Sequence, residues 1–284
     1  MNFPWSSAQD ALLAAALAED FGDAGDVTTD ALVDPGLPAA AEIRAREPLV
    51  LAGLEFARRA FLAVEPRLSV EFLAEDGDSV AAGAAVLRVS GPARGILSAE
   101  RTALNALQRL CGIATQTAAL VCVTRPAGVR LLDTRKTLPG WRALDKYAVA
   151  CGGGVNHRLG LYDAVLIKDN HLAYWRERNK GTLADAVRAA RAKCPGLKIE
   201  IEVDTLDQLR DALDGNPDWV LLDNMPPATL REAVALCKGR ALTEASGGIT
   251  AETLPAVAAT GVDAISVGAL THSPRAADLG LDFL

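Results

Sequence analysis

Several features that mark common classes of protein are missing from this sequence of 284 residues. No uninterrupted apolar run approaches the roughly 18 residues that a membrane helix needs, and the first five residues lack the basic start of a secretory signal. The five cysteines form no CxxC pair, so they are interpreted as core thiols of a reduced, cytoplasmic protein. The net charge of −7 repels nucleic acid and anionic lipid, so we expect neither as a partner.

Lysine and histidine are absent from most of the first half. The first lysine is Lys136 and the first histidine is His157. Glu71–Gly91, with its Asp-Gly and Gly turns, looks like the hairpin of lipoyl and biotinyl carrier domains, but a carrier needs an acceptor lysine. We therefore interpret this half as a small sandwich that serves as scaffold. Residues suited to proton or anion chemistry are concentrated after Arg130.

The first half contains helical and strand-like segments of ordinary length. Ser6 followed by Gln9 indicates a helix start, and the stretch from Asp20 to Asp34 is interpreted as loop. A buried helical stripe from Ser98 to about Thr124 has Gly112 in its middle, which favours a break into two helices. The remaining expected elements are strands at Ala39–Val50 and Leu68–Leu73 and a helix at Leu54–Val64.

After residue 128 short apolar strands alternate with helices, which predicts a parallel α/β sheet. Polar residues follow each strand, as in a barrel whose site lies at the carboxyl ends of its strands. A doubly wound open sheet is the alternative, but its GxGxxG signature is absent. The predicted strands are Val129–Thr134, Asp163–Lys168, Lys198–Val203, Asp218–Asp223, Arg240–Ala245 and Asp263–Gly268; the predicted helices include Leu183–Cys194, Leu206–Leu213 and Thr229–Cys237.

The strand ends carry three kinds of chemistry. A cationic set suits carboxylates or phosphates, two carboxylates suit Mg²⁺ or a developing cation, and two small-residue turns could hold phosphate through backbone N–H groups. Taken singly, each is more often a solvated charge, an ordinary alternating strand or a simple turn. Five or six strand ends with matching chemistry favour the functional interpretation. The three groups are Arg135, Lys136, His157, Arg158 and Lys168; Glu202 and Asp223; and Ser246-Gly247-Gly248 with Val267-Gly268.

Nearly continuous motifs resemble the quinolinate phosphoribosyltransferase family. They include Glu100-Arg101-Thr-Ala-Leu-Asn105, Asp133-Thr-Arg-Lys-Thr137, Cys151 to Leu161, Val165 to His171, Leu221-Leu-Asp-Asn-Met225, Ala245-Ser-Gly-Gly-Ile249 and Ile265 to Pro274. The resemblance implies an N-terminal α/β sandwich of residues 1–114, joined by the tail 275–284, and an incomplete α/β barrel of residues 115–274. It also implies a homodimer with shared active sites, and allows a larger oligomer of dimers.

The resemblance further implies transfer of phosphoribosyl from phosphoribosyl pyrophosphate to quinolinate, giving nicotinate mononucleotide, pyrophosphate and CO₂ with Mg²⁺ as cofactor, in de novo NAD biosynthesis. Lys136, Lys168, Glu202 and Asp223 would be catalytic, the last two near Mg²⁺. By motif match, Arg101 (from the partner subunit), Arg135, His157, Arg158 and Lys168 would hold the quinolinate carboxylates, Thr134 and Lys136 would lie at the substrate boundary, and Ser246, Gly247, Gly248, Val267, Gly268 and Ala269 would bind the 5′-phosphate end.

Three alternative functions were considered for this sequence. One is a molybdenum-associated barrel protein of the same fold, expected to lack the segment Lys168–His171. Another is a phosphoribosyltransferase that takes nicotinate without decarboxylation, against which the doubled cationic set argues. The third is a lipoyl-like interaction module with a degenerate barrel, which the lysine-free hairpin disfavours.

Overall fold

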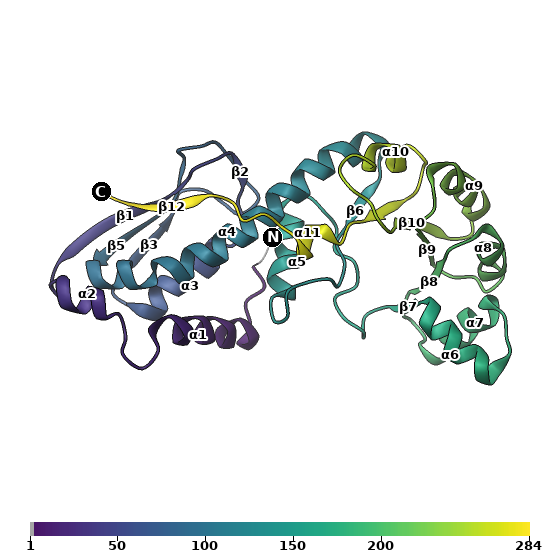
Figure 1. Cartoon of the computed structure of the whole chain (residues 1–284), viewed down its shortest axis with the longest axis horizontal. Coiled ribbons are helices and arrows are strands. Elements are labelled where there is room, and N and C mark those ends of the chain that lie inside the picture. Colours follow the sequence, from purple (N-terminus) through teal and green to yellow (C-terminus); the bar gives the residue numbers. More distant parts are fainter. Residues whose placement is uncertain (1–2) are drawn as a thin grey trace. The chain divides into compact units, whose positions relative to one another are not determined.

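The computed structural model describes residues 3–284; Met1 and Asn2, part of the segment considered for a signal, lie outside it. The chain forms two compact units (Figure 1). Among the described residues, the first comprises 3–118, 137–153 and 270–284, and the second comprises 119–136 and 154–269.

The first unit is built on an antiparallel sheet in the order β12-β1-β5-β3. The C-terminal strand β12 pairs with β1, with Ala41 opposite Phe283, so the end of the chain returns to the N-terminal sheet. Strand β1 buries Ala41 and Ile43 on one face of the sheet. Glu42 between them is also buried, and it pairs with Arg44 and Arg88. The elements of this part are α1 (Ser7–Phe21), α2 (Val27–Leu32), β1 (Pro38–Ala45), β2 (Leu49–Val50), α3 (Leu54–Val64), β3 (Ser69–Phe72), β4 (Ser79–Val80), β5 (Ala85–Pro92) and β12 (Leu279–Phe283).

Two sequence expectations for the first unit were wrong. Asp20–Asp34 is not all loop, because Asp26 accepts a hydrogen bond from the amide of Thr29 and thereby caps α2. The long helix α4 (Ala93–Thr124) is not broken at Gly112. A Cβ at Gly112 would lie 2.0 Å from the carbonyl oxygen of Arg275, so glycine is there for close packing rather than for a turn.

Helix α4 continues through the 3₁₀ turn η1 (Arg125–Ala127), and the whole stretch Ala93–Ala127 is long and apolar enough to cross a membrane. The expectation above, that no segment is long enough to cross a membrane, considered only uninterrupted apolar runs and therefore did not include this helix. Half of its most apolar window is buried inside the protein, as in the core helix of a globular domain. The stripe of Ala103, Leu104 and Leu107 is fully buried, as its spacing predicts.

Residues 137–153, which the sequence placed with the barrel, group with the first unit. They contain α5 (Arg142–Cys151). The buried carboxylate of Asp145 accepts two hydrogen bonds from Arg109, at 3.1 and 3.0 Å. The Tyr147 hydroxyl donates to Asp76 at 2.9 Å. These polar contacts attach α5 to helix α4 and to the loop before β4.

The second unit contains a parallel sheet in the order β6-β11-β10-β9-β8-β7. The first strand of this set pairs with the last, whereas β6 and β7 do not pair within the described residues. The sheet is therefore a barrel open between its first two strands, and the predicted fold class is confirmed. The strands are β6 (Arg130–Leu132), β7 (Val165–Ile167), β8 (Ile199–Val203), β9 (Trp219–Asp223), β10 (Leu242–Ser246) and β11 (Ala264–Ser266).

Helices join successive strands of the barrel and contact their neighbours in chain order. Capping explains where several begin: Thr182 and Thr205 accept hydrogen bonds from the amides of Asp185 and Gln208. Most of these helices bury an apolar face, for example Leu209 and Leu213 of α8. The helices are α6 (Asp169–Asn179), α7 (Leu183–Lys193), α8 (Leu206–Leu213), α9 (Pro227–Cys237), α10 (Leu254–Ala258) and α11 (Ala269–His272).

Candidate active site

Strand register brings the strand-end side chains of the second unit to one face. Glu200 is opposite Leu166 and Trp219, Glu202 is opposite Leu221, and Ser246 is opposite Asp223. Paired residues of parallel strands point to the same side, and side chains alternate along each strand. The side chains of Glu200, Glu202, Asp223 and Ser246 therefore share the inner face of the open barrel.

Arg135 and Arg158 form a cationic pair in this unit. Burial, and next the positive charge of Arg135, lower the pKa of the Arg158 guanidinium. Arg158 donates to the carbonyl oxygen of Ala164 at 3.1 Å. The Nε of Arg135 is buried and has no hydrogen-bond partner among residues 3–284. Two neighbouring guanidinium groups with an unsatisfied donor suit an anion with several oxygens.

Two carboxylates, Glu202 and Asp223, lie at the ends of the neighbouring strands β8 and β9. The Nζ of Lys168 lies 2.5 Å from Oε2 of Glu202. Burial, followed by the negative charges of Glu202 and Asp204, raises the pKa of Asp223. A cation near Glu202 and Asp223 would relieve this repulsion, and oxygen ligands are those that Mg²⁺ prefers. The residues therefore fit the expected magnesium site.

The turn after β10 packs closely against the residue that follows β9. Gly247 has φ +92°, and a Cβ there would lie 2.2 Å from Oδ1 of Asn224. Asn224 donates its amide N–H to the carbonyl of Ser246 at 2.9 Å and its side-chain N–H to Asp223 at 2.7 Å. Asn224 thus ties the carboxylate of Asp223 to the Ser246-Gly247-Gly248 turn.

The other expected site residues lie around the same strand ends, except one. Thr134 accepts a hydrogen bond from the amide of Lys136 at 3.1 Å, directly after β6. Val267, followed by Gly268 and Ala269, extends β11 by donating to the carbonyl of Leu132 at 3.0 Å. Arg101 is an exposed residue of α4 in the first unit, where it pairs with Glu100 at 2.9 Å.

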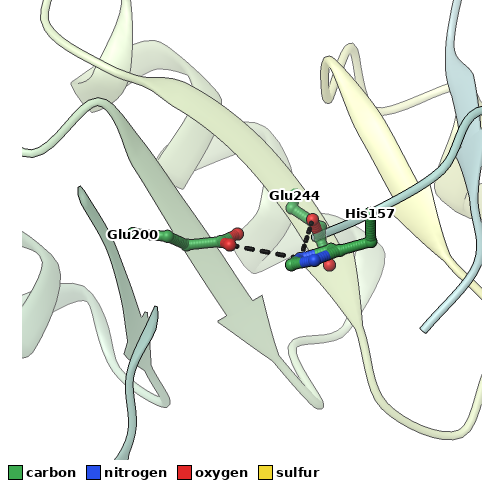
Figure 2. Close-up of side chains that lie close together, drawn as sticks. All are labelled: His157, Glu200 and Glu244. Carbon is green, nitrogen blue, oxygen red and sulfur yellow. Dashed lines mark ion pairs between the residues drawn. The ribbon is translucent and has the colours of Figure 1, made fainter. Parts of the chain in front are cut away.

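His157 belongs to a buried cluster with two glutamates (Figure 2). Its Nε2 lies 3.2 Å from Oε2 of Glu200 and 3.4 Å from Oε2 of Glu244. Its backbone N–H donates to Oδ1 of the fully buried Asp133 at 2.7 Å. The segment holding His157 extends the sheet, because Val155 bridges Leu132 in parallel.

The pKa of His157 is set by competition between burial and its two glutamate partners. Burial alone would lower the pKa of His157, but the hydrogen bonds to Glu200 and Glu244 outweigh burial and raise the pKa to about 10. Burial also raises the pKa of Glu200. The amide of Arg158 donates to Nδ1 at 2.7 Å, which requires a lone pair there and favours a neutral ring beside one protonated glutamate. A cationic ring between two carboxylates would carry the same net charge, since the proton count is equal.

Sequence reasoning missed four members of this site: Asp133, Glu200, Asn224 and Glu244. Glu200 and Glu244 lie in buried strands that carry other polar residues as well, so neither gave a distinct signal in the sequence. Asp133 is fully buried directly after β6. Asn224 has φ +53°, a left-handed conformation that the sequence does not reveal.

An open parallel barrel with a paired guanidinium site, neighbouring carboxylates and a glycine turn defines an α/β-barrel enzyme for polyanionic substrates. The family model of the quinolinate phosphoribosyl transferase N-terminal domain matches residues 26–111, and that of the C-terminal domain matches residues 113–282. The chain belongs to this family. The family, the fold and the enzyme class predicted from the sequence are confirmed.

Relatives agree over nearly the whole chain. The nicotinate-nucleotide pyrophosphorylase [carboxylating] of Mycobacterium leprae is 46% identical over 94% of each chain, and the probable enzyme of Bacillus subtilis is 41% identical over 93% of this chain and 89% of its own. The solved structure of the nicotinate-nucleotide pyrophosphorylase from Francisella tularensis is 40% identical, has a TM-score of 0.92 and covers 98% of this chain and 96% of its own.

Proposed function

We propose that this protein transfers phosphoribosyl from phosphoribosyl pyrophosphate to quinolinate with loss of CO₂, and so forms nicotinate mononucleotide for NAD biosynthesis. The observation that carries the proposal is the pair of Arg135 and Arg158, with its unsatisfied buried Nε. In a chain of net charge −7, such a pair serves a local anion. A substrate with two adjacent carboxylates matches it, and the named relatives act in the same reaction class.

Quinolinate is held by Arg135, Arg158 and Lys168, with Thr134 and Lys136 at its edge. The pyridine nitrogen attacks C1 of the ribose while the bond to pyrophosphate breaks. The nitrogen then carries positive charge, which stabilises the electron pair left on C2 as the bond to CO₂ breaks. C2 then takes up a proton from water, and this completes nicotinate mononucleotide. Positioning of two polyanions is the main contribution of the protein.

Glu202 and Asp223 face the ribose, where carboxylates stabilise the positive charge that develops as pyrophosphate leaves. Bound Mg²⁺ would neutralise the leaving pyrophosphate. The turn Ser246-Gly247-Gly248 and the segment Val267-Gly268-Ala269 offer backbone N–H groups to the 5′-phosphate. The close packing of Gly247 against Asn224 supports this role, since a side chain at Gly247 would not fit in the turn.

The working assembly is a homodimer with shared active sites. Support comes from Arg101, an exposed arginine in the first unit, whereas the other proposed site residues belong to the second. In a shared site, Arg101 of one subunit completes the carboxylate site of the other. A larger oligomer of dimers, a cytoplasmic location, and the lack of membrane or nucleic-acid partners stay predictions.

Product analysis with alternative substrates tests the proposal. The protein, Mg²⁺ and phosphoribosyl pyrophosphate are incubated with quinolinate or with nicotinate. We expect nicotinate mononucleotide and pyrophosphate from the incubation with quinolinate, and no nucleotide from the incubation with nicotinate. Turnover of nicotinate without turnover of quinolinate would favour the non-decarboxylating alternative.

A further inference from the structure

Both ring nitrogens and the backbone N–H of His157 are engaged in contacts within the protein. Nε2 faces Glu200 and Glu244, Nδ1 accepts the amide of Arg158, and the backbone N–H donates to Asp133. The ring therefore has no nitrogen to offer a substrate carboxylate without breaking a buried contact. This arrangement differs from the direct carboxylate contact that the family resemblance implied for His157.

We propose that Glu200 and Glu244 form a buried clamp that fixes the His157 ring, and that His157 in turn fixes Arg158 for the substrate carboxylate. The inference rests on the proposed function and deepens it, because it makes all three side chains positioning residues of that site. Each glutamate also keeps one buried oxygen, Oε1, without a hydrogen-bond partner among the described residues.

The cationic pair explains why a clamp is needed. Arg135 and Arg158 repel each other when no anion lies between them. Arg158 directly follows His157, whose ring accepts the Arg158 amide at 2.7 Å. The Glu200 charge also acts on Arg158 and opposes the effect of Arg135 on its pKa. The clamp thus fixes the backbone from which the Arg158 side chain extends, while the guanidinium donates to the carbonyl of Ala164. Ordering this segment before substrate arrives lowers the cost of binding.

A metal ion is the competing interpretation, because the ligand atoms of His157, Glu200 and Glu244 lie within 4.8 Å of one another. A ligating histidine normally donates its second ring N–H to an acceptor. Here the second nitrogen receives an N–H from Arg158, so metal binding at Nε2 would place two hydrogens against each other. The hydrogen-bond direction therefore favours the clamp.

Substitutions that keep or remove the acceptor test the clamp by steady-state kinetics on the whole protein. Glu244→Gln keeps an oxygen for Nε2–H, whereas Glu244→Met has similar size and no such acceptor. We expect Glu244→Met to raise the KM for quinolinate at least about tenfold, with the KM for phosphoribosyl pyrophosphate changed less than about twofold. Glu244→Gln should stay within about threefold of wild type on both. Equal losses for both substrates, or no loss, would overturn the clamp.

A double-mutant cycle shows whether the glutamate acts through the histidine. In a His157→Ala background, Glu244→Met should add less than about a twofold change in the KM for quinolinate. A full additional effect would overturn the proposal. Wild-type turnover of quinolinate is measured first, since its absence would count against the proposed function and not against the clamp.

A measurement on wild type covers the case in which these variants do not fold. The chain has three histidines, so ¹⁵N-histidine labelling gives few signals. We expect His157 to carry hydrogen on Nε2 and to keep Nδ1 as an acceptor when quinolinate is added. A change of tautomer on adding quinolinate, or loss of the Nε2 hydrogen on adding Zn²⁺ alone, would overturn the clamp in favour of a direct substrate or metal ligand.

Discussion

The ammonium group of Lys168 lies 2.5 Å from the carboxylate of Glu202, which extends from the neighbouring strand. The pair joins a cation proposed to hold quinolinate to a carboxylate proposed to face the ribose. The Lys168 side chain is 43% exposed and that of Glu202 is 13% exposed, so an incoming substrate can reach the lysine. The two halves of the substrate site are thus coupled through one ion pair.

Lys168→Met should lower kcat/KM for quinolinate about 100-fold or more. The substitution removes an ammonium group proposed to bind a substrate carboxylate, and it leaves the Glu202 carboxylate without its partner. Lys168→Arg keeps the charge and serves as the matched control; we expect a smaller loss, since its geometry differs. Initial rates at varied quinolinate concentration measure both. Wild-type kinetics for Lys168→Met would contradict the assigned role.

Gly247→Ala and Gly248→Ala are a matched pair that separates a clash from backbone strain. Both positions have positive φ, but the nearest atom to a new Cβ is at 2.2 Å for Gly247 and at 4.0 Å for Gly248. Strain alone costs about 1–2 kcal/mol, and overpacking adds about 1–3 kcal/mol. We expect Gly247→Ala to have the lower Tm and the higher KM for phosphoribosyl pyrophosphate. Equal effects of the two variants would refute the close-packing explanation.

Asp26 should stabilise the first unit only while it is ionised. It accepts hydrogen bonds from the amide of Thr29 at 2.9 Å and the hydroxyl of Ser98 at 2.7 Å, and its hydrogen bonds to Thr29 are the main cause of its lowered pKa. A lowered folded-state pKa means that the stabilisation is present above the unfolded pKa of about 3.9 and is lost as the pH falls through the folded value.

Asp26→Asn keeps the cap but cannot titrate, so it isolates the charge. We expect the variant to melt below wild type at pH 7 and the difference in Tm to shrink below about pH 4. Melting curves from pH 7 to pH 3 measure this. A difference that stays constant over that range would show that the charge of Asp26 does not contribute.

Shared active sites predict complementation between inactive variants. Arg101→Ala and Lys136→Ala alter residues of different units. If Arg101 acts in the partner's site, mixed dimers contain one intact site, and mixing the two inactive proteins should restore up to about a quarter of wild-type activity by random exchange of subunits. Each variant mixed with itself is the control. Failure to restore activity after proven subunit exchange would place Arg101 in its own subunit's site or outside the site.

Much of the barrel could be predicted because each strand is a short apolar segment followed by polar residues. Helix α8 begins and ends where its sequence pattern indicated, and β8 and β9 differ from the predicted strands by one residue at one end. The break expected at Gly112 is not present. That glycine instead allows close packing against a segment more than 160 residues later in the chain. Local propensity does not contain such a contact.

The site was predictable only in part. Arg135 and Lys168 stood out because they follow strand ends, and Arg158 because it follows a glycine run and a histidine. Glu200 and Glu244 did not, because one glutamate inside an alternating strand resembles an ordinary polar position. Their importance depends on strand register, which brings both to His157. Register is set by the pairing of distant segments, so the sequence alone could not reveal the cluster.

Isotope-labelled quinolinate tests the central claim most directly. One sample carries ¹³C in the carboxyl group at C2 of the ring, and a second carries it in the carboxyl group at C3. With phosphoribosyl pyrophosphate and Mg²⁺, the account predicts labelled CO₂ from the first sample alone, in equal amount to nicotinate mononucleotide and pyrophosphate. The C3 label should remain in the nucleotide. Absence of labelled CO₂ from the first sample, or nucleotide formed with both carboxyl groups retained, would contradict the account.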